Sequence, residues 1–214
     1  MNLLIIGAPG TGKGTMSALI KEEFPIVHIS TGDMLREAIA NETNIGKIAN
    51  HYISNGQLVP DDVIHGIIVE RLGKDDIKNG FLFDGYPRTQ NQAIDLDEIL
   101  KSLNINLDKV LYLDIDDEVL KTRITGRRLC SKCNEIYHVV SKPSKVEGVC
   151  DICGGELIQR ADDTLESLVN RLEAYHGMTQ PVIEYYEKQG LVTRINADQA
   201  PAKVFADIKD ALKD

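Results

Sequence analysis

Short apolar runs alternate with longer amphipathic stretches along most of the chain. The apolar runs predict strands at 2–6, 26–29, 81–84, 109–115 and 192–195. Patterns of helical period predict helices near 13–24, 31–40, 43–54, 61–72, 89–101, 117–125, 164–188 and 201–213. Apolar strands separated by helices are typical of a parallel sheet that is covered on both faces. We therefore predict an α/β fold with a five-stranded parallel sheet flanked by helices.

Two segments interrupt this alternation and are predicted to be insertions. Residues 30–59 contain two helical patterns but no strand before the alternation resumes. Residues 127–163 contain all four cysteines and no amphipathic helix. The remaining segments, 1–29, 60–126 and 164–214, are predicted to form the core.

Composition restricts the class of protein. The chain has 214 residues and a net charge of −9, from 24 Lys plus Arg against 33 Asp plus Glu. Proteins that bind nucleic acid usually carry a basic face, so no nucleic-acid partner is predicted. No apolar run reaches the roughly 18–20 residues of a membrane span, and the first residues, MNLLIIG, do not have the pattern of a signal peptide. We expect a cytoplasmic protein without a membrane partner.

A glycine-rich loop follows the first predicted strand and precedes a helix. Its sequence, GAPGTGKGT at 7–15, is typical of a loop that wraps a phosphate chain with backbone N–H groups and a helix N-terminus. Lys13 would add a full positive charge for the β and γ phosphates. Gly14 stands where a Ser or Thr usually contacts Mg²⁺, so we expect Mg²⁺ to be held mainly by phosphates and water. The predicted phosphate-binding residues are Gly10, Thr11, Gly12, Lys13, Gly14 and Thr15.

The third predicted strand ends in a second candidate site. Asp84 closes that strand at its carboxyl end, where ligands bind in open α/β sheets, and its carboxylate could orient Mg²⁺ or its waters. Asp33 is a second outer-shell candidate, although an Asp in the first turn of a helix also favours the helix dipole. The turn 85–88 brings Arg88 to the edge of the sheet, and a guanidinium group suits a phosphate.

The four cysteines form two CxxC pairs, Cys130 with Cys133 and Cys150 with Cys153. This spacing predicts a tetrahedral zinc site, and disulfides are less favoured in a chain without an export signal. Four thiolates leave no open coordination position, so one structural Zn²⁺ per chain is predicted and His138 is not needed as a ligand. Asn134, which tolerates left-handed dihedral angles, follows the first pair, where a glycine is common.

Several of these motifs together resemble a known family. The segments 7–15, 30–36 (STGDMLR), 84–88 (DGYPR), 126–128 (GRR) and 160–163 (RADD) resemble, in order, the motifs of the nucleoside monophosphate kinases, and of the adenylate kinases among them. The four-cysteine segment resembles the zinc-bearing lid of long bacterial forms. The resemblance implies a P-loop kinase with a monophosphate-binding insertion at 30–59 and a zinc-binding lid at 127–163. It also implies a monomer that carries out Mg²⁺-dependent, reversible phosphoryl transfer from ATP to AMP, giving two ADP without a covalent intermediate.

The resemblance also assigns individual residues. Arg36 and Arg88 would clamp the phosphate of AMP. The residues around its base and ribose would be Thr31, Gln57, Leu58, Val59, Gly85 and Gln92. The residues implied at the donor nucleotide are Arg123, Arg127, Ile136, Tyr137 and Gln199. Arg160 and Arg171 would bridge both nucleotides. The implied catalytic residues are Lys13, Arg88, Arg123, Arg160 and Arg171.

The remaining charged residues near the lid have supporting roles in this interpretation. Asp162 and Asp163 are expected to hold the arginines, because an acceptor phosphate is already ionised and needs no general base. Arg128 is expected to be solvated. Tyr137 could equally well pack inside the small lid.

Other functions remain open at this point. The acceptor could be UMP or CMP, or the donor GTP, although Thr31 and the four-cysteine lid favour the adenylate branch. The cysteine module could be a nucleic-acid-binding ribbon on a P-loop regulator, against which the acidic charge argues. The chain could also be a P-loop ATPase that does mechanical or switch work.

Overall fold

The computed structural model describes residues 1–213. Within them, a five-stranded parallel sheet has the order β2-β3-β1-β4-β8. Its strands are β1 (Asn2–Gly7), β2 (Val27–Ser30), β3 (Phe81–Asp84), β4 (Lys109–Asp114) and β8 (Val192–Asn196). Each predicted strand is present to within about a residue, and the predicted α/β class is confirmed.

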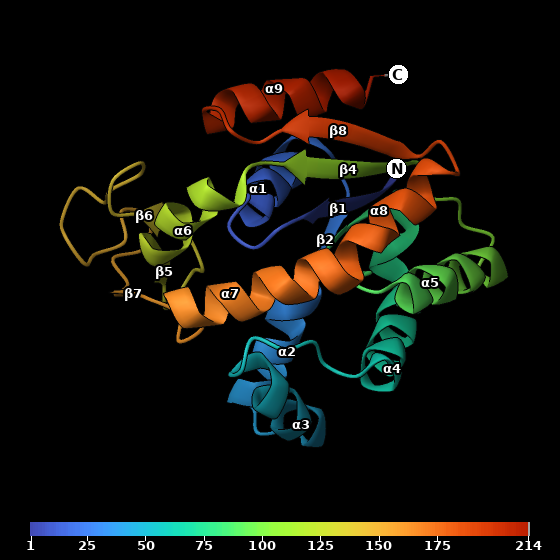
Figure 1. Cartoon of the computed structure of the whole chain (residues 1–214), viewed down its shortest axis with the longest axis horizontal. Helices are drawn as coiled ribbons and strands as arrows, with labels where there is room; N and C mark the ends of the chain where they lie inside the picture. Colours follow the sequence, from blue (N-terminus) through green and yellow to red (C-terminus); the bar gives the residue numbers. More distant parts are fainter. Residues whose placement is uncertain (214) are drawn as a thin grey trace.

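Helices cover both faces of this sheet (Figure 1). Their bounds are α1 (Lys13–Glu23), α2 (Thr31–Ala40), α3 (Asn44–Ile53), α4 (Asp61–Leu72), α5 (Gln90–Ser102), α6 (Asp117–Thr125), α7 (Leu165–Ala174), α8 (Gln180–Glu187) and α9 (Pro201–Ala211). A short 3-10 helix, η1 (Asp75–Asn79), was not predicted. The segment predicted as a single helix, 164–188, is helical without a break from α7 to α8. Its middle part, η2 (Tyr175–Thr179), is a π-helical turn rather than α-helix. No helix within residues 1–213 is both long and apolar enough to cross a membrane.

The core lies on the two faces of the sheet because successive residues of β1 point in opposite directions. Leu3 and Ile5 pack in a cluster with residues of α1 and α9. Leu4 and Ile6 pack in a larger cluster with residues of α4, α5, α7 and α8. Burial on both faces explains why the three central strands, β3, β1 and β4, are largely apolar, whereas the edge strands β2 and β8 also contain polar residues.

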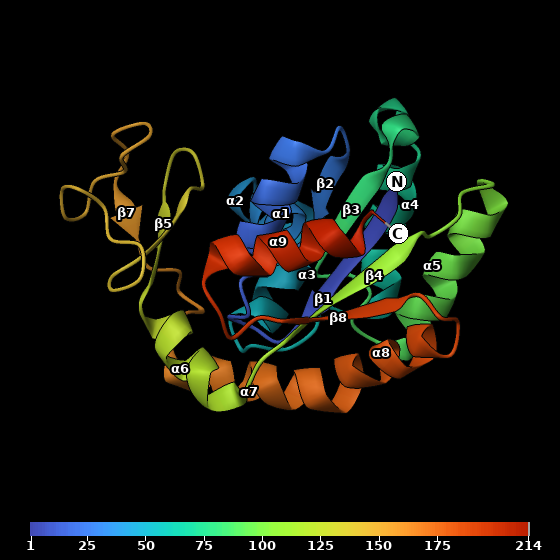
Figure 2. The same cartoon turned by 90° about the horizontal axis from the view of Figure 1, so that it is seen from above.

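The segment 127–163 forms a second, smaller sheet that stands to one side of the core beyond α6 (Figure 2). Its antiparallel strands are β5 (Arg127–Cys130), β6 (Ile136–His138) and β7 (Leu157–Ile158), in the order β6-β5-β7. These strands were not predicted, because they are only two to four residues long. The segment contains no helix among the described residues, as expected.

The other inserted segment, 30–59, contains α2 and α3 packed closely together at Gly46. A β-carbon at Gly46 would lie 2.0 Å from the carbonyl oxygen of Ala38, which belongs to the backbone and cannot rotate away. We therefore expect Gly46→Ala to lower the free energy of unfolding by about 1–3 kcal/mol, the usual cost of overpacking. Urea denaturation measures it.

Gly66 in α4 provides the matched control for this substitution. A β-carbon there would meet no atom of the described residues within 4 Å. Gly66→Ala is therefore expected to raise the free energy of unfolding by about 0.5–1 kcal/mol, because alanine is the better helix former. If the two variants unfolded at the same urea concentration, the close contact between α2 and α3 would be contradicted.

Candidate active site

The glycine-rich loop joins β1 to α1 at the carboxyl edge of the sheet. Gly10 and Gly12 have φ angles of 90° and 97°, in the left-handed region that favours glycine. Gly12 is the N-cap of α1 and supplies no side chain to its first N–H groups. These groups and the positive end of the helix dipole are therefore available to an anion in the loop.

Lys13 begins α1, and its side chain reaches back into this loop. Its Nζ donates hydrogen bonds to the carbonyl oxygens of Gly7 at 2.7 Å and Ala8 at 3.1 Å. Burial lowers the pKa of Lys13 to about 8, against the opposing effect of the Asp84 carboxylate. A desolvated ammonium group is stabilised by any anion that enters the loop, so Lys13 favours phosphate binding.

Asp84 lies at the end of β3, beside β1, with Ile5 as its partner in the register. Its Oδ2 is 3.5 Å from Nε2 of His28 on β2. Burial alone would raise the pKa of Asp84, but the His28 ring and the Lys13 charge outweigh it and hold that pKa below its usual value. Asp84 thus offers an ionised carboxylate near the phosphate loop, which fits the proposed role towards Mg²⁺ and its waters.

The turn after β3 fixes Arg88 through several backbone contacts. Arg88 Nε donates to the carbonyl oxygen of Gly85 at 2.9 Å, and the Arg88 N–H donates to Oε1 of Gln92 at 2.8 Å. Thr179 of η2 donates its hydroxyl to the Arg88 carbonyl oxygen at 2.9 Å. Burial in the cleft lowers the pKa of Arg88 from its usual value. The guanidinium group is held in place before any ligand binds.

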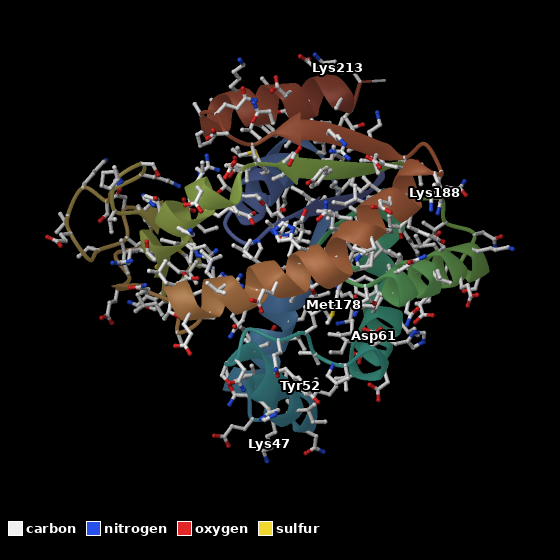
Figure 3. The ribbon with its side chains drawn as sticks, in the orientation of Figure 1. Lys47, Tyr52, Asp61, Met178, Lys188 and Lys213 are labelled. Atoms are coloured by element: carbon white, nitrogen blue, oxygen red, sulfur yellow. The ribbon has the colours of Figure 1, made fainter. Side chains whose placement is uncertain are left out.

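Gln92 is almost fully buried, unlike an ordinary surface residue of a helix. Its Nε2 donates to Oδ1 of Asp61 at 2.6 Å, and Asp61 also accepts a hydrogen bond from the Thr89 hydroxyl. Asp61 lies at the beginning of α4, where Figure 3 labels it. Both ends of the Gln92 amide are therefore fixed in orientation, with one lone pair and one N–H left for a base.

A second cluster of charged residues lies at the beginning of α2. Arg36 Nη2 donates to Oδ1 of Asp33 at 2.5 Å, and Arg160 Nη2 lies 3.9 Å from the same oxygen. Burial would raise the pKa of Asp33, but the Arg36 guanidinium outweighs it and the pKa falls. Burial lowers the pKa of Arg160 to about 10, with Arg36 and Arg127 adding repulsion. An incoming phosphate would relieve this repulsion.

A pocket of about 650 Å³, part of which is open to solvent, contains most of the predicted AMP site. Its lining includes Thr31, Arg36, Gln57, Leu58, Val59, Gly85, Arg88, Gln92 and Arg171. The Thr31 hydroxyl is already engaged, since it donates to the Gly85 carbonyl oxygen at 2.8 Å. Arg160 is not part of this lining; it lies 3.9 Å from Asp33, the residue after Gly32 of the lining.

One arginine–aspartate pair connects α7 to the lid, and a second joins the two ends of the lid segment to each other. Arg171 Nη1 donates to Oδ2 of Asp162 at 3.1 Å, and burial lowers the pKa of Arg171 to about 10. Arg127 Nε donates to Oδ2 of the fully buried Asp163 at 2.8 Å. The two aspartates hold arginines, as the sequence predicts. Side-chain nitrogen atoms gather between α7 and the sheet in Figure 3.

Three further residues were predicted at the donor nucleotide, and two of them, Arg123 and Gln199, contact the same loop after β8. Arg123 on α6 donates to the Ala197 carbonyl oxygen at 3.1 Å, and Gln199, two residues further along that loop, donates to the Asn196 carbonyl oxygen at 2.9 Å. Ile136 lies against the phosphate loop, since a β-carbon at Gly14 would be 3.2 Å from Ile136 Cδ1.

The surroundings of Tyr137 and Arg128 decide two open points about the lid. Tyr137 is buried with Cys130 and Cys150, so its ring packs inside the lid. Arg128 was expected to be solvated, but it is half-buried and donates to the carbonyl oxygens of Thr125 and Arg127 at 3.2 and 2.7 Å. The expectation for Arg128 was wrong because β5 turns its guanidinium back towards the end of α6.

The four cysteine sulfur atoms converge in the lid. All four lie within 4.8 Å of one another, and the Sγ atoms of Cys130 and Cys153 are 3.4 Å apart. Tetrahedral Zn²⁺ with bonds of about 2.3 Å places its sulfur ligands about 3.8 Å apart, so the cluster fits zinc. Asn134 has a φ of 60°, the left-handed geometry that its position in the knuckle requires.

The sequence did not indicate that His28, Asp61 and Thr179 contact the site. Each holds a predicted site residue: His28 lies beside Asp84, Asp61 bonds Gln92, and Thr179 bonds the Arg88 backbone. The only available signals were a polar residue inside an apolar strand for His28 and a helix-capping position for Asp61. Thr179 carried no signal, because its role depends on the π-helical turn.

The loop, the ionised carboxylate beside it and the adjoining arginine-lined cavity define a P-loop protein that acts on nucleotide phosphates. Residues 5–191 match the family model described as adenylate kinase. The chain is 51% identical over 212 residues to an adenylate kinase of Geobacillus sp. (strain WCH70), covering 99% of this chain and 98% of that protein. It is 49% identical over 214 residues to an adenylate kinase of Thermoanaerobacter sp. (strain X514), covering 100% and 99%. The chain belongs to the adenylate kinase family.

Membership of this family confirms the resemblance inferred from the motifs. It also confirms the P-loop kinase fold and the expected enzyme class, in which ATP and AMP give two ADP. A streptococcal relative agrees: the chain is 50% identical over 214 residues to an adenylate kinase of Streptococcus thermophilus (strain CNRZ 1066), covering 99% of this chain and 98% of that protein.

Proposed function

We propose that the donor ATP binds with its phosphates in the glycine-rich loop and that AMP binds in the cavity lined by Arg36 and Arg88. One observation carries this assignment. A second cavity, of about 550 Å³, includes Gly7, Pro9 and Lys13 in its lining and shares Arg88 and Arg171 with the AMP cavity. The phosphate ends of two nucleotides would therefore meet at Arg88 and Arg171, as direct transfer requires.

The side chains around this junction act by position and charge. The attacking group is an ionised phosphate oxygen of AMP, so no general base is needed. Lys13, Arg88, Arg123, Arg160 and Arg171 would stabilise the negative charge on the transferring group. Asp84, with Asp33 further out, would hold the waters of a Mg²⁺ ion whose chemistry is to neutralise the β and γ phosphates. Ile136 and Gln199 are proposed to lie near the donor base, with Tyr137 next to Ile136 on β6 and its ring inside the lid.

The decisive assay mixes ATP, AMP and Mg²⁺ and measures ADP, then replaces AMP by UMP, CMP or GMP and ATP by GTP. We expect ADP formation that requires AMP and Mg²⁺. Comparable rates with UMP or CMP would make the chain a pyrimidine nucleotide kinase. Release of inorganic phosphate from ATP without an acceptor would make it an ATPase.

Arg88→Lys is expected to impair the AMP side of the reaction. Lysine keeps the charge but loses the planar, two-pronged donor geometry. We expect kcat to fall and KM for AMP to rise by at least about tenfold, the loss of about 1.4 kcal/mol, with little change in ATP affinity. Steady-state kinetics with each substrate varied in turn separates these effects.

The control is Arg71→Lys, at an arginine that pairs in bidentate fashion with Asp76 on the surface, at 2.7 and 2.8 Å. Its kinetics should match those of the parent protein. If Arg88→Lys weakened ATP binding and left AMP kinetics intact, the two nucleotide sites would be assigned in the wrong order.

We propose that 30–59 and 127–163 move against the core formed by 1–29, 60–126 and 164–214. Closure would exclude water from the transferring phosphate, which otherwise would be hydrolysed. The expected result is a shorter distance between dyes attached at Asn41 and Ser144 when a bisubstrate analogue binds, measured by energy transfer. An unchanged distance at saturation would contradict moving segments.

We further propose that the chain is a cytoplasmic monomer with one structural Zn²⁺ in the lid. The four cysteines are not bonded to one another, which suits both a reducing compartment and a Cys₄ site. No coordination position would remain for substrate, so the metal would stabilise the lid and take no part in the transfer. Sedimentation and metal analysis of the purified protein test the monomer and the stoichiometry.

A further inference from the structure

Tyr137 occupies an unusual position inside the lid. It lies on β6, is only 4% exposed, and packs in the small buried cluster with Cys130 and Cys150. Its hydroxyl oxygen is 3.5 Å from Cys150 Sγ. The same oxygen accepts a hydrogen bond from the backbone N–H of Asp151, at 2.7 Å.

These two contacts determine where the phenolic hydrogen points. A backbone N–H can only donate, so the Asp151 contact uses a lone pair of the tyrosine oxygen. The hydroxyl hydrogen remains, and the sulfur of Cys150 is the acceptor within reach. Once a metal is bound, that sulfur is a thiolate, which accepts hydrogen bonds and has no proton to donate.

We infer that Tyr137 is a positioning residue of the metal site, whose O–H donates a hydrogen bond to the Cys150 thiolate and slows loss of the zinc. The inference rests on the proposed zinc site. It assigns to Tyr137 a role within the lid that is separate from any contact with the donor base.

Burial explains why this thiolate needs such a partner. Cys150 is 2% exposed, whereas Cys133 and Cys153 are exposed to solvent. A buried anion requires hydrogen bonds from the protein, because water cannot supply them. The Tyr137 contact also joins β6, which follows the first CxxC pair, to the turn between Cys150 and Cys153. The hydrogen bond therefore connects the two halves of the metal site.

Tyr137→Phe removes the hydroxyl and keeps the ring. In zinc-loaded protein, we expect the affinity for zinc to fall about tenfold, the lower end of the usual effect of such partners. Competition with a chromogenic chelator measures this affinity, which is called zinc retention below. The matched control is Tyr185→Phe, which removes a hydroxyl bonded to Asp97 at 2.7 Å outside the lid. Its zinc retention should equal that of the parent protein.

The absorption spectrum of cobalt-loaded protein shows whether the Tyr137 hydroxyl donates a hydrogen bond or the ring only fills space. A hydrogen bond withdraws electron density from the thiolate, so its loss should move the sulfur-to-cobalt charge-transfer band to longer wavelength. Replacing tyrosine by 3-fluorotyrosine at 137 gives a stronger donor of nearly the same shape, and it should move the band to shorter wavelength. This second variant keeps the test available if Tyr137→Phe fails to fold.

Opposite band shifts in the two variants, with weaker retention in Tyr137→Phe, would support the inference. Unchanged retention and an unchanged band would overturn it, and so would weaker retention without a band shift, because the ring contact alone would then explain the loss. A parent protein that binds neither zinc nor cobalt would instead refute the proposed zinc site itself.

Discussion

Lys13→Met is expected to lower kcat by about 10² to 10³, the usual effect of removing one electrostatic contact to a transition state. Lys13 Nζ now bonds the carbonyl oxygens of Gly7 and Ala8 inside the phosphate loop. In the reaction its charge would meet the charge that develops between the β and γ phosphates. Methionine has a similar length without the charge, so the loss isolates the electrostatic effect. The measurement is kcat at saturating ATP and AMP.

Proton uptake provides an independent check on Lys13. Burial lowers its pKa to about 8 in the free protein, so about half of the molecules carry an uncharged Lys13 at pH 8. Bound phosphates favour the charged form and raise the pKa, so ATP binding at pH 8 should take up about half a proton more in the parent protein than in Lys13→Met. Calorimetry in two buffers of different ionisation enthalpy measures the difference.

The control for both experiments is Lys188→Met, at an exposed lysine just after α8. It should leave kcat and proton uptake unchanged. A less than tenfold loss of kcat in Lys13→Met, with unaltered proton uptake, would place Lys13 away from the phosphates.

The main sheet could be predicted from sequence chiefly because its central strands, β3, β1 and β4, are buried on both faces. Runs such as Leu3 to Ile6 are apolar at every position, a pattern that helices and loops of this chain do not share. The strands of the lid gave no such signal. They are two to four residues long, and the lid's buried cluster contains cysteines and Tyr137 instead of an apolar run. The π-helical turn at Tyr175–Thr179 leaves the helical period almost unchanged, so it too escaped prediction.

The site was predictable where a motif and a local backbone geometry coincide. Gly10 and Gly12 are required by their positive φ angles, and the CxxC spacing brings together the two cysteines within each pair. The contacts between distant segments were not predictable. His28 meets Asp84 because β2 and β3 are neighbours in the sheet, and Thr179 meets Arg88 because η2 crosses the turn after β3. Those pairings depend on the order of strands and helices in space, which a single sequence does not give.

Loss of the lid metal is the second change for which we expect a large effect. The lid, 127–163, is too small to bury a sufficient core, and its buried cluster within the described residues consists of Cys130, Tyr137 and Cys150. Structural zinc contributes on the order of 10 kcal/mol to the folding of small modules. Chelation of the metal, or Cys150→Ser, is therefore expected to lower Tm by about 6 °C or more, the effect of about 2–3 kcal/mol in a domain of this size.

Hydrogen exchange would show where the stability is lost. Lid amides such as those of Cys130 and Leu157, which bond the carbonyl oxygens of Glu135 and Gly148, should lose protection, while β1 and β4 keep theirs. Ser131→Ala, at an exposed lid position between the cysteines, is the control and should change neither Tm nor exchange.

Because four thiolates saturate zinc, phosphoryl transfer at low temperature should persist wherever the lid still folds. Full stability with complete loss of activity after chelation would make the metal catalytic, and metal-free protein with four freely titrating thiols would exclude the site altogether.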